Sequence, residues 1–299
     1  MNTATDGPSP LQTPRPRSLV FGWAVVVLGL VAALLLLWGG QEFAARYPVD
    51  SLAAAIVLFY FALFGPLVVL ALVLGRIERL RVMRTGEAPL KWSVIGLAVG
   101  VGGLAASAGY VWLNGTMAPA PSLLAEDLAD VAPAWFLAMG LAITVLQVGA
   151  EEMLFRGWLL SSLQQKLGPA LAVIVSALAF SAFHLLGGAS SLLSLVNLVL
   201  GGIWFALLAQ RSGGLIAPFL AHYGWNVTED IGFGLVPNPG VGEFGSLLNQ
   251  DMVGAALWGG SDEGLNASIA MSVVLVALIV PLLPVFSRSP KSQPRVQPN

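Results

Sequence analysis

No cysteine occurs in this chain of 299 residues, and only 10% of its residues are charged. Without cysteine the protein cannot form disulfides, use a thiolate nucleophile or hold zinc through sulfur. A soluble domain carries about a quarter charged residues, so the low charge argues against a soluble fold. The net charge is -2 and no long basic tract is present, which excludes a typical nucleic-acid-binding surface.

Long apolar runs take the place of the missing charge, and hydrophobic residues make up 57% of the chain. Runs of about 20 residues match the ~30 Å hydrocarbon core of a bilayer. We therefore predict an all-α, polytopic membrane helix bundle with about eight transmembrane helices. The predicted spans are 19–39, 51–75, 92–113, 133–163, 169–187, 191–210, 214–235 and 265–286.

The two ends of the chain are polar. Residues 1–17 are rich in proline and are expected to form a disordered tail, residues 18–286 the bundle, and residues 287–299 a polar C-terminal tail. The first apolar run is too long and begins too far into the chain for a cleavable signal peptide.

Basic residues predict the orientation, because short cytoplasmic loops are enriched in lysine and arginine. Of the 14 basic residues, Arg46 falls in a loop on the other side and Arg156 within a span, which leaves twelve on one side. These twelve are Arg15, Arg17, Arg76, Arg79, Arg81, Arg84, Lys91, Lys166, Arg211, Arg288, Lys291 and Arg295. We expect both termini to be cytoplasmic, with the chain in a bacterial inner membrane.

Three ionisable residues lie within the fourth predicted span, where charges are costly and are functional candidates by default. Glu152 and Arg156 are four residues apart and share a helix face, so they are expected to pair. Glu151 points about 100° away and is left free to face a cavity. The alternative is that all three form an ion-pair cluster that only holds helices together.

The only two histidines, His184 and His222, also lie within predicted spans, and Asn226 shares a helix face with His222. At about 1.5 Å per residue, Glu151 and His184 lie at nearly the same height, roughly 24 Å from the turn that joins their helices. His222 and Asn226 fall at overlapping depths. We therefore expect one polar site built from three helices.

This set of side chains is suited to hydrolysis by activated water. Glu151 would act as the general base and His184 would hold the water. His222 and Asn226 would donate hydrogen bonds to the developing oxyanion. A zinc ion on Glu151, His184 and His222 is an equally weighted alternative, since two histidines and a carboxylate are a known catalytic ligand set.

Other membrane hydrolase sites are not matched. The chain has no H-E-x-x-H helix and no G-x-S-x-G elbow, because residues 188–192 break the latter pattern at its last position. An aspartyl dyad is excluded, since Asp230 is the only aspartate within a predicted span.

Three motifs in succession, E-E-x-x-x-R at 151–156, F-x-x-x-H at 180–184 and H-x-x-x-N at 222–226, resemble the CAAX prenyl protease and bacteriocin-processing (Abi-type) intramembrane proteases. The resemblance covers about 135–235, and we take 133–235 as the protease core. It implies a peptide or protein substrate that can be membrane-anchored. The site residues that it implies are Glu151 as the water-activating carboxylate, Glu152 and Arg156 in support, and His184, His222 and Asn226.

Two other functions use the same buried residues. A transporter would employ the cluster as a proton or ion relay, and a non-catalytic scaffold would retain only the bundle. Glu229 and Asp230 follow Asn226 in the same span, where they either line the mouth of a cavity or end the helix at the surface. We assign neither a catalytic role.

Overall fold

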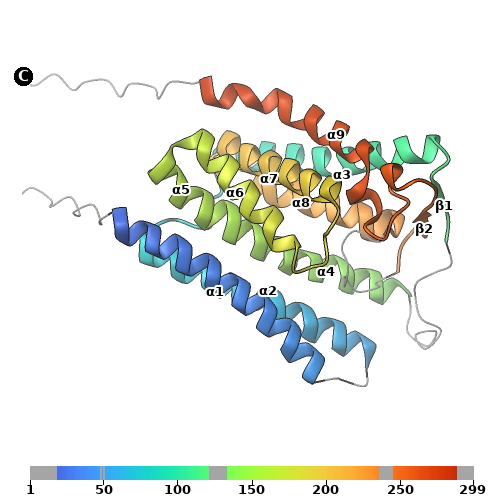
Figure 1. Ribbon diagram of the computed structural model, residues 1–299, viewed down its shortest axis with the longest axis horizontal. Coiled ribbons are helices and arrows are strands. Elements are labelled where there is room, and N and C mark those ends of the chain that lie inside the picture. Colours follow the sequence, from blue (N-terminus) through green and yellow to red (C-terminus); the bar gives the residue numbers. More distant parts are fainter. Residues whose placement is uncertain (1–18, 48, 50, 121–132, 236–244, 288–299) are drawn as a thin grey trace, which may run out of the picture.

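The computed structural model describes residues 19–47, 49, 51–120, 133–235 and 245–287, and these are mostly helical (Figure 1). The helices are α1 Leu19–Arg46, α2 Leu52–Glu78, α3 Pro89–Leu113, α4 Pro133–Glu152, α5 Leu160–Leu167, α6 Pro169–His184, α7 Leu192–Ser212, α8 Ile216–Val227 and α9 Ile269–Ile279. Four further short helical segments are the π-helical Met153–Leu159 and Thr228–Phe233 and the 3₁₀-helical Ala256–Trp258 and Gly264–Ala267. A last 3₁₀ segment, Val280–Ser287, continues α9.

Seven of the eight predicted spans coincide with a helix or with a continuous run of helical segments, and the eighth, 265–286, is interrupted at Ser268, whose backbone is extended. The fourth span is the longest, because Met153–Leu159 joins α4 to α5 without a break. Within the described ranges, five helices are long and apolar enough to cross a membrane, and these are Leu19–Arg46, Ala53–Glu78, Pro89–Leu113, Ala134–Leu167 and Leu192–Ser212. The predicted polytopic, all-helical membrane bundle is confirmed.

The remaining three helices are shorter than predicted. The helix α6 has 16 residues and so rises roughly 24 Å, less than the hydrocarbon thickness. The helices α8 and α9 change to π and 3₁₀ geometry before the predicted ends of their spans. The tail 1–17 and residues 288–299 lie outside the described residues.

One small sheet departs from the all-helical prediction. Strand β1, Met117–Pro119, pairs antiparallel with β2, Gln250–Met252, and places Met117 opposite Met252. The strands join the segment after α3 to the segment before α9 at one end of the bundle (Figure 1). Three-residue strands are too short to show the alternation that predicts a strand from sequence.

Small residues bring α3 directly against α8. Gly96 and Gly100 lie four residues apart on α3, and a Cβ on either glycine would collide with the backbone of Ala217 or Ala221 on α8. Such small-residue contacts let helix backbones approach closely in membranes, where van der Waals packing drives association. The position of α8, which carries His222, therefore depends on this contact.

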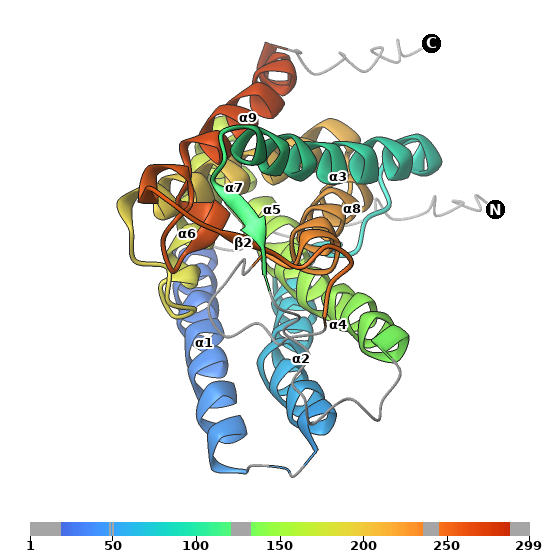
Figure 2. The same ribbon diagram turned by 90° about the vertical axis from the view of Figure 1, so that its right-hand side faces the viewer.

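The helices α1 and α2 form a pair that stands to one side of the others, with α4 beside α2 (Figure 2). A buried polar cluster connects the end of α2 to the helical segments that follow α4. The Glu78 carboxylate accepts hydrogen bonds from Trp158 Nε1 at 2.8 Å, Ser162 Oγ at 2.9 Å and Lys166 Nζ at 2.7 Å. Residues of α1, α2 and α4 also line a common pocket.

Candidate active site

The polar residues of the fourth span lie where α4 changes to π-helix. Glu151 and Glu152 end α4, and Arg156 belongs to the following π-helical turns, whose seven residues are all buried. π-Helical turns are rare and frequently occur at functional sites. The segment packs against α2, α6 and α7, so it lies in the centre of the bundle.

Glu152 joins two helices through one oxygen. Its Oε1 accepts from Arg156 Nη1 at 2.8 Å and from His222 Nδ1 at 2.9 Å. Glu152 and Arg156 are each 1% exposed. The predicted Glu152–Arg156 pair is therefore present, and it also contacts His222 on α8. Since a carboxylate only accepts, His222 carries its hydrogen on Nδ1 and directs Nε2 elsewhere.

Aromatic rings hold these groups in place. The Arg156 guanidinium lies 4.4 Å from the centre of the Phe180 ring and 5.1 Å from that of Phe205. Phe205 also stacks on His222, with 4.5 Å between ring centres and 22° between planes. Cation–π contacts of this kind strengthen when the cation is desolvated. The rings therefore fix the orientation of both side chains.

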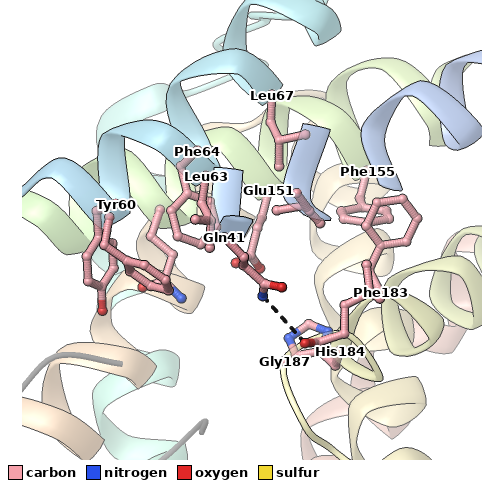
Figure 3. Close-up of a pocket in the computed structure, with 14 residues that line it drawn as sticks. Gln41, Tyr60, Leu63, Phe64, Leu67, Glu151, Phe155, Phe183, His184 and Gly187 are labelled. Carbon is pink, nitrogen blue, oxygen red and sulfur yellow. Dashed lines mark hydrogen bonds between the residues drawn. The ribbon is translucent and has the colours of Figure 1, made fainter. Parts of the chain in front are cut away.

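Glu151 and His184 line one pocket, as Figure 3 shows. The pocket lies between α1, α2, α4 and the end of α6. Most of its wall is apolar and is contributed by Leu37, Phe59, Tyr60, Leu63, Phe64, Leu67, Phe155, Phe183 and Leu186. Gln41 closes one side by donating to the carbonyl of Leu186 at 3.5 Å, the dashed line in Figure 3.

Both histidines lie near Glu151, but their ring nitrogens make different contacts. Glu151 Oε2 is buried, has no hydrogen-bond partner among the described residues, and lies 3.8 Å from His222 Nε2. His184 donates from Nδ1 to the carbonyl of Phe180 at 2.8 Å, which leaves its Nε2 free to accept. The structure thus brings Glu151 and His184 to the wall of the apolar pocket and places His222 next to Glu151.

Asn226 does not line the pocket of Glu151. It lines a second pocket together with His222, Glu229 and residues of α7 and α9. His184 is the one residue that appears in the linings of both pockets. Glu229 is 2% exposed and lines this pocket, so of the two alternatives for this residue the structure favours the cavity over an exposed helix end.

The zinc alternative needs three ligands at one point. In the part of the chain that the structure describes, no three His, Asp or Glu side chains are arranged to hold a metal ion. Coordination by Glu151, His184 and His222 would require these side chains to move, so the arrangement as it stands does not fit a zinc site.

Several pocket residues were not predicted from the sequence. Gln147 lies one helical turn before Glu151 on the same pocket wall, and its i, i−4 spacing was a signal that could have revealed it. Gln41 and Tyr60 come from α1 and α2, whose apolar sequences gave no such signal.

Comparison with known proteins supports the resemblance seen in the motifs. A family model described as type II CAAX prenyl endopeptidase Rce1-like matches residues 133–228. Comparison with curated proteins and with solved structures gave no match. The matched segment contains all six predicted site residues and ends immediately before Glu229. Residues 133–228 are therefore similar to the type II CAAX prenyl endopeptidase Rce1-like family.

Proposed function

We propose that this protein is an intramembrane endopeptidase that hydrolyses a peptide bond with a water molecule activated by Glu151. The observation that carries the proposal is the free Oε2 of Glu151, buried beside His184 and 3.8 Å from His222 Nε2. That separation is too long for a direct hydrogen bond. A water molecule held by both atoms would satisfy them and would lie at the wall of the apolar pocket.

Glu151 acts as the general base in this mechanism. As the water oxygen bonds to the scissile carbonyl carbon, Glu151 takes a proton from the water, and the carbonyl π electrons move to the oxygen. Collapse of the tetrahedral intermediate breaks the C–N bond, and Glu151 returns the proton to the leaving amine. The products are a carboxylic acid and an amine.

The two histidines and Asn226 have separate roles. His222 is held by Glu152 through Nδ1 and accepts the second hydrogen of the water through Nε2. His184 is oriented by donating from Nδ1 to the Phe180 carbonyl, and it forms part of the wall of both pockets beside the scissile bond. Asn226, whose amide lines the second pocket, donates to the oxyanion of a substrate that lies between the two pockets. Glu152 and Arg156 act through His222 as positioning residues.

The substrate is a peptide with an apolar or lipid-modified residue next to the scissile bond. The wide pocket beside Glu151 is lined mainly by leucine and aromatic side chains, which suits an apolar group. Such a peptide would be anchored in the bilayer and would reach the pocket from there.

Contacts between the basic loops support the predicted orientation. The loop after α2 contacts the loop before α8, because Leu215 N donates to the Arg84 carbonyl at 2.7 Å. Lys166 lies beside Gly22 near the start of α1. The basic loops thus gather at one end of the bundle, and we place that end and both termini in the cytoplasm.

The test compares Glu151→Gln with a matched variant, Glu42→Gln, at an exposed position on α1. Both proteins would be reconstituted in liposomes with prenylated and unmodified peptides, and products would be identified by mass spectrometry. Loss of a general base typically costs about 100- to 10,000-fold in rate, so Glu151→Gln should lose turnover while Glu42→Gln keeps it. A Glu151→Gln protein that still cleaves would refute the mechanism.

The same assay decides whether a metal is needed. The arrangement of Glu151, His184 and His222 predicts that prolonged chelation leaves the cleavage rate unchanged. Loss of activity on chelation, restored by zinc and matched by zinc in the purified protein, would favour the metal site instead.

A further inference from the structure

The second pocket contains a carboxylate that the proposed mechanism does not use. Glu229 belongs to the π-helical turns after α8, is 2% exposed and lines this pocket beside Asn226. Its Oε1 is buried and has no hydrogen-bond partner among the described residues. A buried carboxylate without a partner is costly and normally needs a cation or a set of donors.

The neighbours of Glu229 do not supply that cation. The pocket lining contains no lysine and no arginine. The amide of Asn197 is fully used, because Nδ2 donates to the carbonyls of Asn266 and Ser268 and Oδ1 accepts from Ser272 Oγ at 2.6 Å. The buried Arg156 is committed to Glu152 and to the carbonyl of Gly202. The pocket lining therefore contains a carboxyl group and no basic side chain to pair with it.

We propose that the second pocket binds a positively charged side chain of the substrate, a lysine or arginine close to the scissile bond. The inference rests on the proposed peptidase function and names its specificity. The apolar pocket receives one side of the cleaved peptide, the acidic pocket receives the other, and His184 lies between them in the walls of both.

Helix spacing limits where the basic residue falls. Glu229 is seven residues after His222, or roughly 10 Å along the helix. An extended peptide advances roughly 3.3 Å per residue, and a lysine or arginine side chain adds further reach. The basic residue therefore lies within about two positions of the scissile bond.

Charge exchange tests the site directly. Fluorescent peptides with one apolar half would carry lysine, glutamine or glutamate at successive positions in the other half. Wild-type protein should cleave a lysine peptide about 10- to 100-fold faster than its glutamine analogue, as expected for a hydrogen bond to a buried charge. Glu229→Gln should abolish this preference and Glu229→Lys should shift it to the glutamate peptide. The preference should persist in Asp230→Asn, which removes a charge one residue away, outside the pocket lining.

A second pair of variants works without altering any charge. Gly201 lines the pocket, and a Cβ there would meet nothing within 4 Å, so Gly201→Leu adds a bulky side chain at the pocket wall without a collision at its Cβ. Gly102 on α3 is equally open and lies outside the pocket, so Gly102→Leu is the matched control. Gly201→Leu should lose the lysine preference and Gly102→Leu should keep it.

Binding separates this inference from the proposed function. In the Glu151→Gln background, fluorescence anisotropy should show the lysine peptide binding about 10- to 100-fold more tightly than the glutamine peptide, and adding Glu229→Gln should remove the difference. If the wild-type protein cleaves no peptide while Glu229-dependent binding of the lysine peptide is observed, the result supports the acidic pocket and counts against the peptidase. Cleavage or binding that does not distinguish lysine from glutamine, or a preference unchanged in Glu229→Gln, would overturn the acidic pocket alone.

Discussion

Removing Arg156 should destabilise the bundle far more than removing both Arg156 and the charge of Glu152. In Arg156→Met the methionine fills much of the same volume, but Glu152 loses its 2.8 Å ion pair and keeps only His222 as a partner. Glu152 is 1% exposed, so water cannot replace the lost partner. Breaking a buried pair in this way typically costs about 3–5 kcal/mol.

The double variant isolates the charge. The double variant Glu152→Gln/Arg156→Met leaves no uncompensated charge. Its loss of unfolding free energy should be about 2–3 kcal/mol smaller than the sum of the losses in the two single variants. The hydrogen bond to Gly202 and the contact with the Phe180 ring are lost in both proteins that lack Arg156, so they cancel in the comparison. Stability would be measured in detergent micelles by tryptophan fluorescence during unfolding.

Activity provides the second readout of the same variants. His222 is oriented by Glu152, so the double variant should remain slow in cleavage even where its stability recovers. Additive losses of stability, with no coupling between Glu152 and Arg156, would refute the argument that the pair is held together by mutual charge compensation. Full activity in the double variant would refute the positioning role.

Two further predictions concern packing and the loop end of the bundle. Gly100→Ala should lower stability and cleavage, because its Cβ would collide with the backbone of α8, whereas Gly102→Ala, which meets nothing within 4 Å, should be tolerated in the same unfolding assay. Burial raises the pKa of Glu263, but hydrogen bonds from the backbones of Ser191 and Ser190 and from the side chains of Ser194 and Ser190 outweigh it and hold the pKa below its ordinary value. The contact therefore stabilises the loop at neutral pH and is lost as the pH falls through this lowered value, so the protection factors of the Ser190 and Ser191 amides, measured against the intrinsic exchange rate at each pH, should fall in acid. Glu263→Gln should show the lower protection already at neutral pH.

The sequence by itself determined the helices and one local pair. Apolar runs of about 20 residues have few alternatives to helices in a bilayer, because every backbone polar group must be satisfied within the segment. Glu152 and Arg156 pair because residues four apart on a helix are neighbours whatever surrounds them. The close depths of Glu151 and His184 followed for the same reason, since a short turn connects two helices of known rise.

Only the tertiary structure decided which faces of those helices meet. The sharing of Glu152 between Arg156 and His222 depends on how α8 is rotated against α4, and the separation of Asn226 from Glu151 by His184 depends on the same rotation. Spans that are apolar on all sides contain little information about rotation, because lipid and protein interiors are similarly apolar. Close contacts such as those of Gly100 set it instead, and Glu229 faces inward from the π-helical turns after α8, which hydropathy does not reveal.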